Sequence, residues 1–253
     1  MSERFGRKLR ALAAVGLVAT SAAEARKIDL EKFPKNGSPV MIAELLREKA
    51  QSQGHMTEAV AVSVRNGNAY VSAAADPGFG IVQSTEYLHI FDRLQKEYKI
   101  TLDGKEVWLA HNHAADHITA YAVSGGLSED VITRPQALLN GPSLYDCRVS
   151  FSDRNLFKGY VKTSVINLIV EPGGNWVCSG EYPNKGFSDD VAAEYDLVRQ
   201  QLLIVTQSTK KDVRAAISKF EKEVFRLTGV KVKFVPHGAP AVDLERAKEE
   251  VCR

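Results

Sequence analysis

The sequence predicts an α/β (α+β) protein, because helical and strand patterns alternate along the chain. An Asn-Gly pair at residues 66–67 separates two strand-like runs, which is a strong hairpin signal. The apolar run 107–110 predicts a buried strand, and two histidines follow it at alternate positions. With 253 residues, 44% hydrophobic and 25% charged, the chain is long enough for one sizeable domain and a smaller appendage.

The first 25 residues have the order of a secretory signal peptide, with basic, apolar and small residues in turn. The basic residues are Arg4, Arg7, Lys8 and Arg10, the apolar run is 11–19, and Ala23-Glu24-Ala25 has the A-x-A form of a cleavage site. The alternative is an amphipathic N-terminal helix of a cytosolic protein. We expect removal of residues 1–25 and a secreted or periplasmic protein. No other stretch approaches the ~20 apolar residues of a membrane-spanning helix, so no span is expected in the mature chain.

Charge and cysteine content disfavour two classes of function, nucleic-acid binding and zinc-finger ligation. Removal of residues 1–25 takes away four basic and two acidic residues, which brings the formal net charge from +2 to zero. A neutral chain without a basic stripe gives no reason to expect nucleic-acid binding. Cys147, Cys178 and Cys252 allow one disulfide in an oxidising compartment, and the sequence does not choose the pair. No two of them are close in sequence, which disfavours a zinc finger.

Apolar periodicity, N-caps and Gly or Pro residues set the expected elements. In chain order these are a helix opened by Ser38-Pro39 and ended by Gly54, strands 59–64 and 69–71, a helix from Ser84 or Thr85 to Lys99, a strand 105–111, an irregular segment 114–141, a helix from Ser143, strands 164–170 and 176–178, helices 189–205 and 210–228, a strand 230–235 and a helix 242–252. The Gly- and Pro-rich segment 114–141 is expected to be a long loop or insertion, and such loops often cover functional sites.

The strongest chemical signal is the pair His111 and His113. In a strand they project to the same side while Asn112 points away. Two neutral imidazoles on one edge suit a zinc ion, and a catalytic zinc also needs a third ligand, usually a carboxylate, and an open position. The pair by itself also fits two histidines that are hydrogen-bonded in a strand.

Carboxylates elsewhere in the chain are candidates for the third ligand and for a base. Ser143 and Asp146 are three positions apart at a helix start, so they share a face, although this spacing alone also fits an N-cap motif. Glu58 precedes the first strand. The remaining candidate ligands lie nearer to the histidine pair, and they are Asp116, Glu129, Asp130 and the competing imidazole of His117.

Taken together, these residues resemble the signature of the JAMM/MPN metalloprotease family. That signature is an upstream Glu, a His-x-His-Pro segment and a Ser-x-x-Asp segment, and the matching elements here are Glu58, His111-x-His113, Pro142-Ser143-x-x-Asp146 and the strand and turn 166–174. The resemblance covers roughly residues 38–180 and implies a cytidine-deaminase-like mixed sheet flanked by helices. The implied organisation is a signal peptide 1–25, a JAMM/MPN-like domain 26–185 with an insertion 114–141, and a helical C-terminal extension 186–253.

The resemblance also implies a mechanism. Zn²⁺ would be held by His111, His113 and Asp146, with Glu58 as the proton shuttle and Ser143 as a donor to the oxyanion. The implied reaction is hydrolysis of a peptide or isopeptide bond, so the expected partner is a protein or peptide substrate. The sequence leaves the substrate's identity and the oligomeric state open.

Two departures from the family favour an alternative reading as a catalytically inactive MPN-like binding module. Ala114 stands where the family usually has proline, and 33 positions separate His113 from Asp146, a much longer spacing than is usual. A flexible loop tolerates such lengthening at a cost of up to about 1 kcal/mol of closure entropy. The insertion also leaves open whether Asp146 or one of its own carboxylates is the third ligand.

Overall fold

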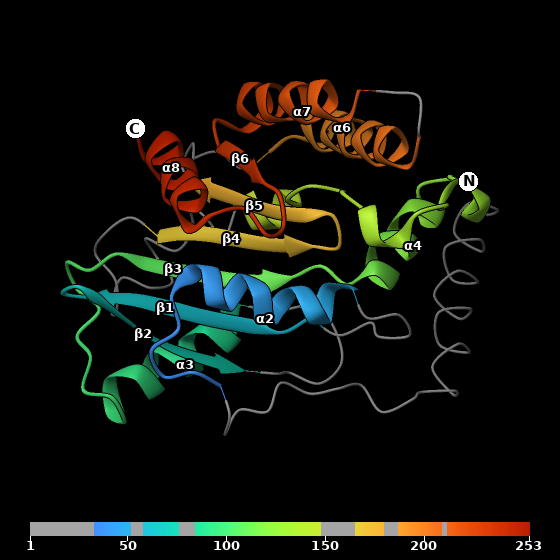
Figure 1. The fold of residues 1–253 in the computed structure, drawn as a ribbon. Coiled ribbons are helices and arrows are strands. Elements are labelled where there is room, and N and C mark those ends of the chain that lie inside the picture. The colour runs from blue at the N-terminus through green and yellow to red at the C-terminus, as the bar shows by residue number, and fades with distance from the viewer. Residues whose placement is uncertain (1–32, 52–57, 76–83, 148–164, 180–186, 209–211) are drawn as a thin grey trace, which may run out of the picture.

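A computed structural model describes residues 33–51, 58–75, 84–147, 165–179, 187–208 and 212–253 (Figure 1). Within them, six strands form one sheet in the order β2-β1-β3-β4-β5-β6. Neighbouring strands are antiparallel except β3 and β4, which are parallel. The mixed sheet and its flanking helices confirm the α/β class predicted from the sequence.

The elements follow one another with short connections wherever both sides are described. They are α2 (Pro39–Gln51), β1 (Val60–Asn66), β2 (Ala69–Ala75), α3 (Ser84–Lys96), β3 (Val107–Asn112), α4 (Ala115–Ser124), the 3₁₀ turns η2 (Glu129–Val131) and η3 (Pro135–Ala137), a helical turn at 144–147, β4 (Val165–Glu171), β5 (Gly174–Ser179), α6 (Asp189–Gln207), α7 (Val213–Thr228), β6 (Lys231–Val235) and α8 (Ala241–Cys252).

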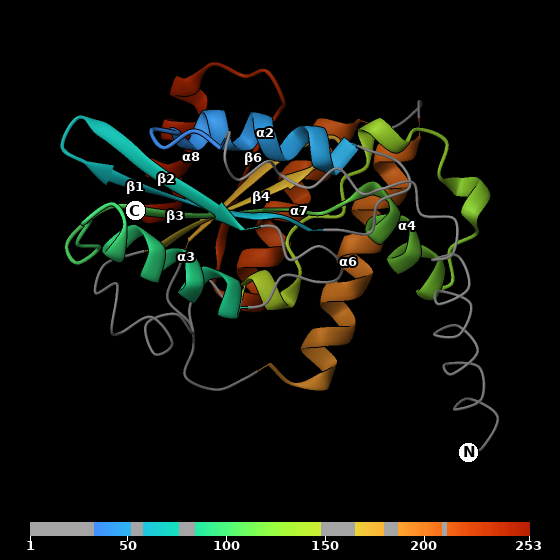
Figure 2. The same ribbon diagram turned by 90° about the horizontal axis from the view of Figure 1, so that it is seen from below.

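Helices cover both faces of the sheet (Figures 1 and 2). One face packs against α2 and α8 through a core that includes Trp108 and Leu168. The opposite face is covered in two halves, with α3 over β1 and β2 and the pair α6 and α7 over β4 to β6. His111 lies between these halves, because its neighbours across the sheet are Val60 in the α3 core and Ile169 in the α6–α7 core.

Most of the expected elements are confirmed, because local signals define their ends. Residues 67–68 turn the β1–β2 hairpin. Ser188 and Asp212 cap α6 and α7 by accepting hydrogen bonds from backbone N–H groups of the first turns. The helix predicted to reach Lys99 ends earlier, at Lys96, and Lys99 itself has a left-handed backbone with φ 55°.

The prediction that 114–141 is irregular is wrong for its first part, which forms α4. Ala115, Ile118 and Ala122 bury one face of this helix against Leu138 and Leu203. Leu203 belongs to α6, about eighty residues further along the chain. The partner surface is therefore remote in sequence, and the glycines and prolines that follow α4 concealed its periodicity.

The C-terminal segment adds a strand to the sheet as well as helices, since β6 pairs with β5. All three cysteines are free thiols, with Cys147 and Cys178 buried and Cys252 exposed. No helix among the described residues is long and apolar enough to cross a membrane. The predicted signal peptide, residues 1–25, lies outside the described residues.

Candidate metal centre

The two histidines lie where β3 ends, and they face the same side as the strand pattern predicts. Their Nε2 atoms are 3.3 Å apart. The backbone N–H of His113 donates to the carbonyl of Val170 at 2.9 Å, which continues the pairing with β4 beyond the end of β3. Asn112 points elsewhere and accepts a hydrogen bond from the N–H of Ala59 at 2.8 Å. Both sides of the strand end are thus held in place.

The third donor comes from the helical turn at 144–147. Ser143 caps this turn by a reciprocal exchange, because its Oγ accepts from the N–H of Asp146 at 3.0 Å while its own N–H donates to Asp146 Oδ2 at 2.5 Å. The same carboxylate reaches both imidazoles, with Oδ1 3.1 Å from His111 Nε2 and Oδ2 3.3 Å from His113 Nε2. The local capping motif therefore also positions the carboxylate of Asp146, a group that can bind a metal, beside the two histidines.

These three side chains can hold a metal ion. Among the described side chains, His111, His113 and Asp146 are the group of three potential ligands whose donor atoms all lie within 4.8 Å of one another. All three are buried, with exposed fractions of 6%, 8% and 5%. Neither Asp116 nor Asp130 belongs to the group, and the side chain of Glu129 is not among those described.

Burial and mutual attraction shift the pKa values of this cluster in opposite directions. Burial alone would lower the pKa of His113, but the charge of Asp146 and hydrogen bonds to Asp146 and Glu171 raise it to about 10. Burial alone would raise the pKa of Asp146, but His111 and His113 hold it well below its usual value. Asp146 is therefore an ionised carboxylate at neutral pH. A metal that binds Nε2 of His113 must displace the proton on that nitrogen.

The outer nitrogens of the two histidines have partners of their own. His111 Nδ1 lies 3.2 Å from the hydroxyl of Tyr87 on α3. His113 Nδ1 lies 3.0 Å from Oε1 of Glu171 at the end of β4. A carboxylate only accepts, so His113 carries a proton on Nδ1 and presents Nε2 toward Asp146. Neither partner was anticipated from the sequence, because strand ends carry polar residues for many reasons.

Glu58 is buried at the same end of the sheet. The register pairs Val60 with His111, and Ala59 bonds to Asn112, so Glu58 continues this pairing to the level of His113. Its Oε1 lies 3.1 Å from Nδ1 of His117. His117 belongs to α4, so the insertion supplies a contact to the candidate base, and His117 is outside the three-ligand group.

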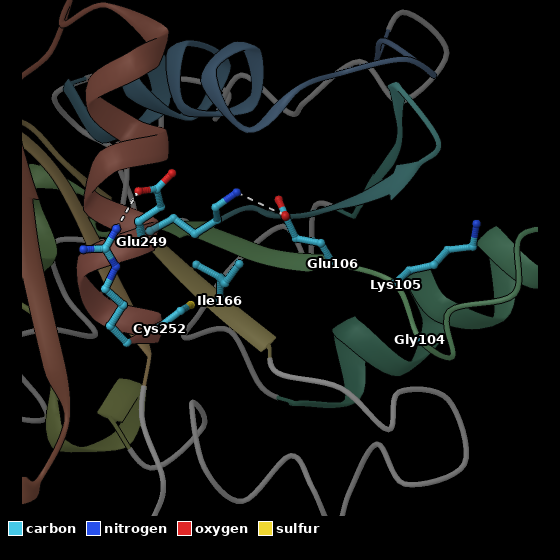
Figure 3. Close-up of a pocket in the computed structure, with 8 residues that line it drawn as sticks. Gly104, Lys105, Glu106, Ile166, Glu249 and Cys252 are labelled. Carbon is cyan, nitrogen blue, oxygen red and sulfur yellow. Dashed lines mark hydrogen bonds and ion pairs between the residues drawn. The ribbon is translucent and has the colours of Figure 1, made fainter.

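A hollow on the described surface lies at the other end of β3, and it is a poor candidate for a site. This open depression of about 450 Å³ is lined by Glu106, Ile166, Lys248, Cys252 and their neighbours (Figure 3). Four of its five charged side chains pair with one another, since Lys248 pairs with Glu106 at 3.1 Å and Arg253 with Glu249 at 3.2 Å. We therefore place the chemistry at the histidine end of β3.

The chain matches no protein-family model, no curated protein and no solved structure.

Proposed function

We propose that this protein is a zinc-dependent hydrolase of peptide or isopeptide bonds, of the JAMM/MPN type. The observation that carries the proposal is the convergence of His111, His113 and Asp146. Asp146 lies 33 positions beyond His113, yet its carboxylate contacts both imidazoles. The residues that resemble the family's ligands thus meet, although the spacing between the two segments departs from the family's.

The donor set supports zinc. Two imidazoles and one carboxylate are ligands that catalytic zinc accepts, and such a site leaves a fourth position open. A tetrahedral site with Zn–N distances of about 2.0–2.1 Å has donors about 3.3 Å apart. The Nε2 atoms of His111 and His113 are 3.3 Å apart, and Oδ1 of Asp146 lies 3.1 Å from Nε2 of His111, both close to that spacing. An oxygen-only cage suited to calcium or magnesium is not what these residues offer.

The chain's own residues would then divide the work of hydrolysis. Zinc, when bound, contributes Lewis-acid chemistry that polarises a carbonyl and acidifies a water. Glu58 would accept the proton of the attacking water and pass it to the leaving amine. Ser143 uses Oγ as the acceptor of its cap, so its hydroxyl proton can be donated to the oxyanion of the tetrahedral intermediate.

His117 supports the assignment of Glu58 as the base. It holds one oxygen of the Glu58 carboxylate at 3.1 Å, which restricts the rotation of that side chain. His117 belongs to the segment 114–141. The fold would then do more than accommodate this long segment, because the segment would also orient the base. The same contact is also the observation that favours the second candidate function, an inactive MPN-like binding module, since one oxygen of the base is already engaged.

The experiment compares Glu58→Gln with wild type in zinc content and hydrolysis. Mature protein should contain about one zinc per chain, and peptide and isopeptide libraries should identify a cleaved substrate. Glu58 does not ligate, so Glu58→Gln should retain zinc while hydrolysis falls ~10² to 10⁴-fold. Glu106→Gln, at the other end of β3, is the matched control and should cleave normally. Equal turnover by Glu58→Gln would reject the mechanism, and a zinc-bearing wild type that cleaves nothing would favour the binding module.

Export completes the proposal, because the signal-like residues 1–25 would deliver the hydrolase to the periplasm or the medium. Exported protein should begin at Arg26 on N-terminal sequencing. A start at Met1 in the exported fraction would contradict it.

A further inference from the structure

Glu171 is a fully buried carboxylate to which neighbouring groups donate four hydrogen bonds. It closes β4, two residues beyond Ile169 on the same face of the sheet as the histidines. Its Oε1 accepts from Nδ1 of His113 at 3.0 Å. Its Oε2 accepts from the indole Nε1 of Trp176 at 2.8 Å and from two backbone N–H groups. A buried carboxylate is stable only when such partners replace water.

Those two backbone N–H groups belong to Asn140 and Gly141, at 3.0 and 3.1 Å. Only Pro142 separates them from Ser143, which caps the turn that carries Asp146. Oε1 of Glu171 therefore holds His113, one histidine of the centre. Oε2 holds the backbone segment that leads to Asp146, the carboxylate of the centre. The bonds to His113 and to Asn140 span 58 and 31 residues. The Glu171 carboxylate therefore connects segments that are far apart in the sequence.

We propose that Glu171 is the positioning residue of the metal centre. It fixes His113 with the proton on Nδ1, so that Nε2 is the metal-binding atom, and it fixes the approach of the segment that carries Asp146. Hydrogen bonds from metal-bound histidines to carboxylates act in this way generally, and they raise the basicity of the imidazole. The inference rests on the proposed zinc site, and it explains how that site tolerates the long segment between His113 and Asp146.

The role requires a carboxylate, because the four groups recorded as bonding to the side-chain oxygens of Glu171 are all donors. A glutamine has one accepting oxygen and one donating NH₂ group. If its NH₂ group faces His113, the imidazole must accept at Nδ1 and carry its proton on Nε2, where the metal would bind. If its NH₂ group faces the other side, it meets the three donors from Trp176, Asn140 and Gly141. Glu171→Gln keeps the shape of the side chain and removes this arrangement in either orientation.

The test measures zinc affinity by competition with a chromophoric chelator in Glu171→Gln and wild type. We expect about 10- to 100-fold weaker binding in Glu171→Gln, the usual effect of removing such a partner. The matched control is Glu106→Gln. Glu106 also accepts from an indole in this sheet, that of Trp108 at 2.7 Å, but none of its recorded partners among the described residues is a histidine. Its variant should bind zinc within about twofold of wild type, even if urea titration finds both variants less stable.

The outcomes distinguish a failure of the proposed zinc site from a failure of the role assigned to Glu171. Wild type that binds no zinc overturns the proposed site and this inference with it. Wild type that binds zinc, together with unchanged affinity in Glu171→Gln, overturns only the role of Glu171. If Glu171→Gln does not fold, NMR of the zinc-loaded wild type shows which nitrogen of His113 carries the proton and which one binds zinc. An exchange-protected proton on Nδ1 of His113 is expected, and coordination through Nδ1 would overturn the inference.

Discussion

The two ends of β3 carry clusters of ionisable side chains that differ in kind. At the N-terminal end, Glu106 accepts hydrogen bonds from Trp108 and Tyr70. It also pairs with Lys248 at 3.1 Å (Figure 3). Burial would raise the pKa of Glu106, but the hydrogen bonds from Trp108 and Lys248 lower it overall. At the C-terminal end, the carboxylates of Asp146 and Glu171 pair with imidazoles instead.

The difference lies in what each cluster has left to bind. A lysine ammonium offers protons and no lone pair, so the N-terminal network is complete once its charges are paired. This network stabilises the fold, because the pair between Lys248 and Glu106 links α8 to the sheet. An imidazole offers a lone pair that a proton or a metal can take. The C-terminal cluster is therefore the one whose protons a divalent cation can replace.

The largest expected effect comes from removing a donor at the histidine end. His111→Ala or His113→Ala should reduce zinc from about one per chain to near zero, because two remaining donors do not make a three-ligand site. His89→Ala, which removes an exposed imidazole of α3, should leave zinc content unchanged. Metal analysis after purification without chelator measures both. Stoichiometric zinc in the His111 and His113 variants would show that the two ends of β3 do not differ as described.

A smaller effect is expected from two glycines with the same backbone. Gly141 and Gly229 both have φ 74°, which costs an alanine about 1–2 kcal/mol. A Cβ at Gly141 would also lie 2.2 Å from Cζ of Phe220, whereas nothing lies within 4 Å of one at Gly229. Gly141→Ala should therefore lose about 1–3 kcal/mol more of the free energy of unfolding than Gly229→Ala.

Urea titration measures this difference in stability. Because Gly141 donates to Glu171, its variant should also bind zinc more weakly, while Gly229→Ala should bind normally. Equal stability and equal zinc affinity in the two variants would contradict the link between this turn and the metal centre.

The smallest effect is expected at the N-terminal end of β3. Lys248→Met keeps the apolar stem of a side chain that is largely buried and removes its pairs with Glu106 and Glu245. Glu106 keeps its hydrogen bonds from Trp108 and Tyr70, so its carboxylate still has partners and the free energy of unfolding should fall by only about 1 kcal/mol. Zinc content should not change. A loss of zinc in this variant would mean that the two clusters are coupled through β3.

Much of the fold follows from local signals. The Asn-Gly hairpin and the apolar periodicities of the C-terminal helices depend on residues that are near one another in sequence. The hairpin and the start of α6 lie where they were predicted, and α7 begins at Val213, three residues later than expected. The helix α4 was missed because its apolar face is completed by Leu203 of α6, and no local pattern reports a partner that distant.

The sequence by itself determined the local halves of the candidate site. The alternation of a strand puts His111 and His113 on one side, and a capped turn presents Asp146 three positions after Ser143. Only the tertiary structure decided that these halves meet, that Glu58 contacts His117, and that Glu171 lies behind His113. The physical reason is range, because periodicity and capping act over a few residues, whereas these contacts join segments 33 to 59 residues apart.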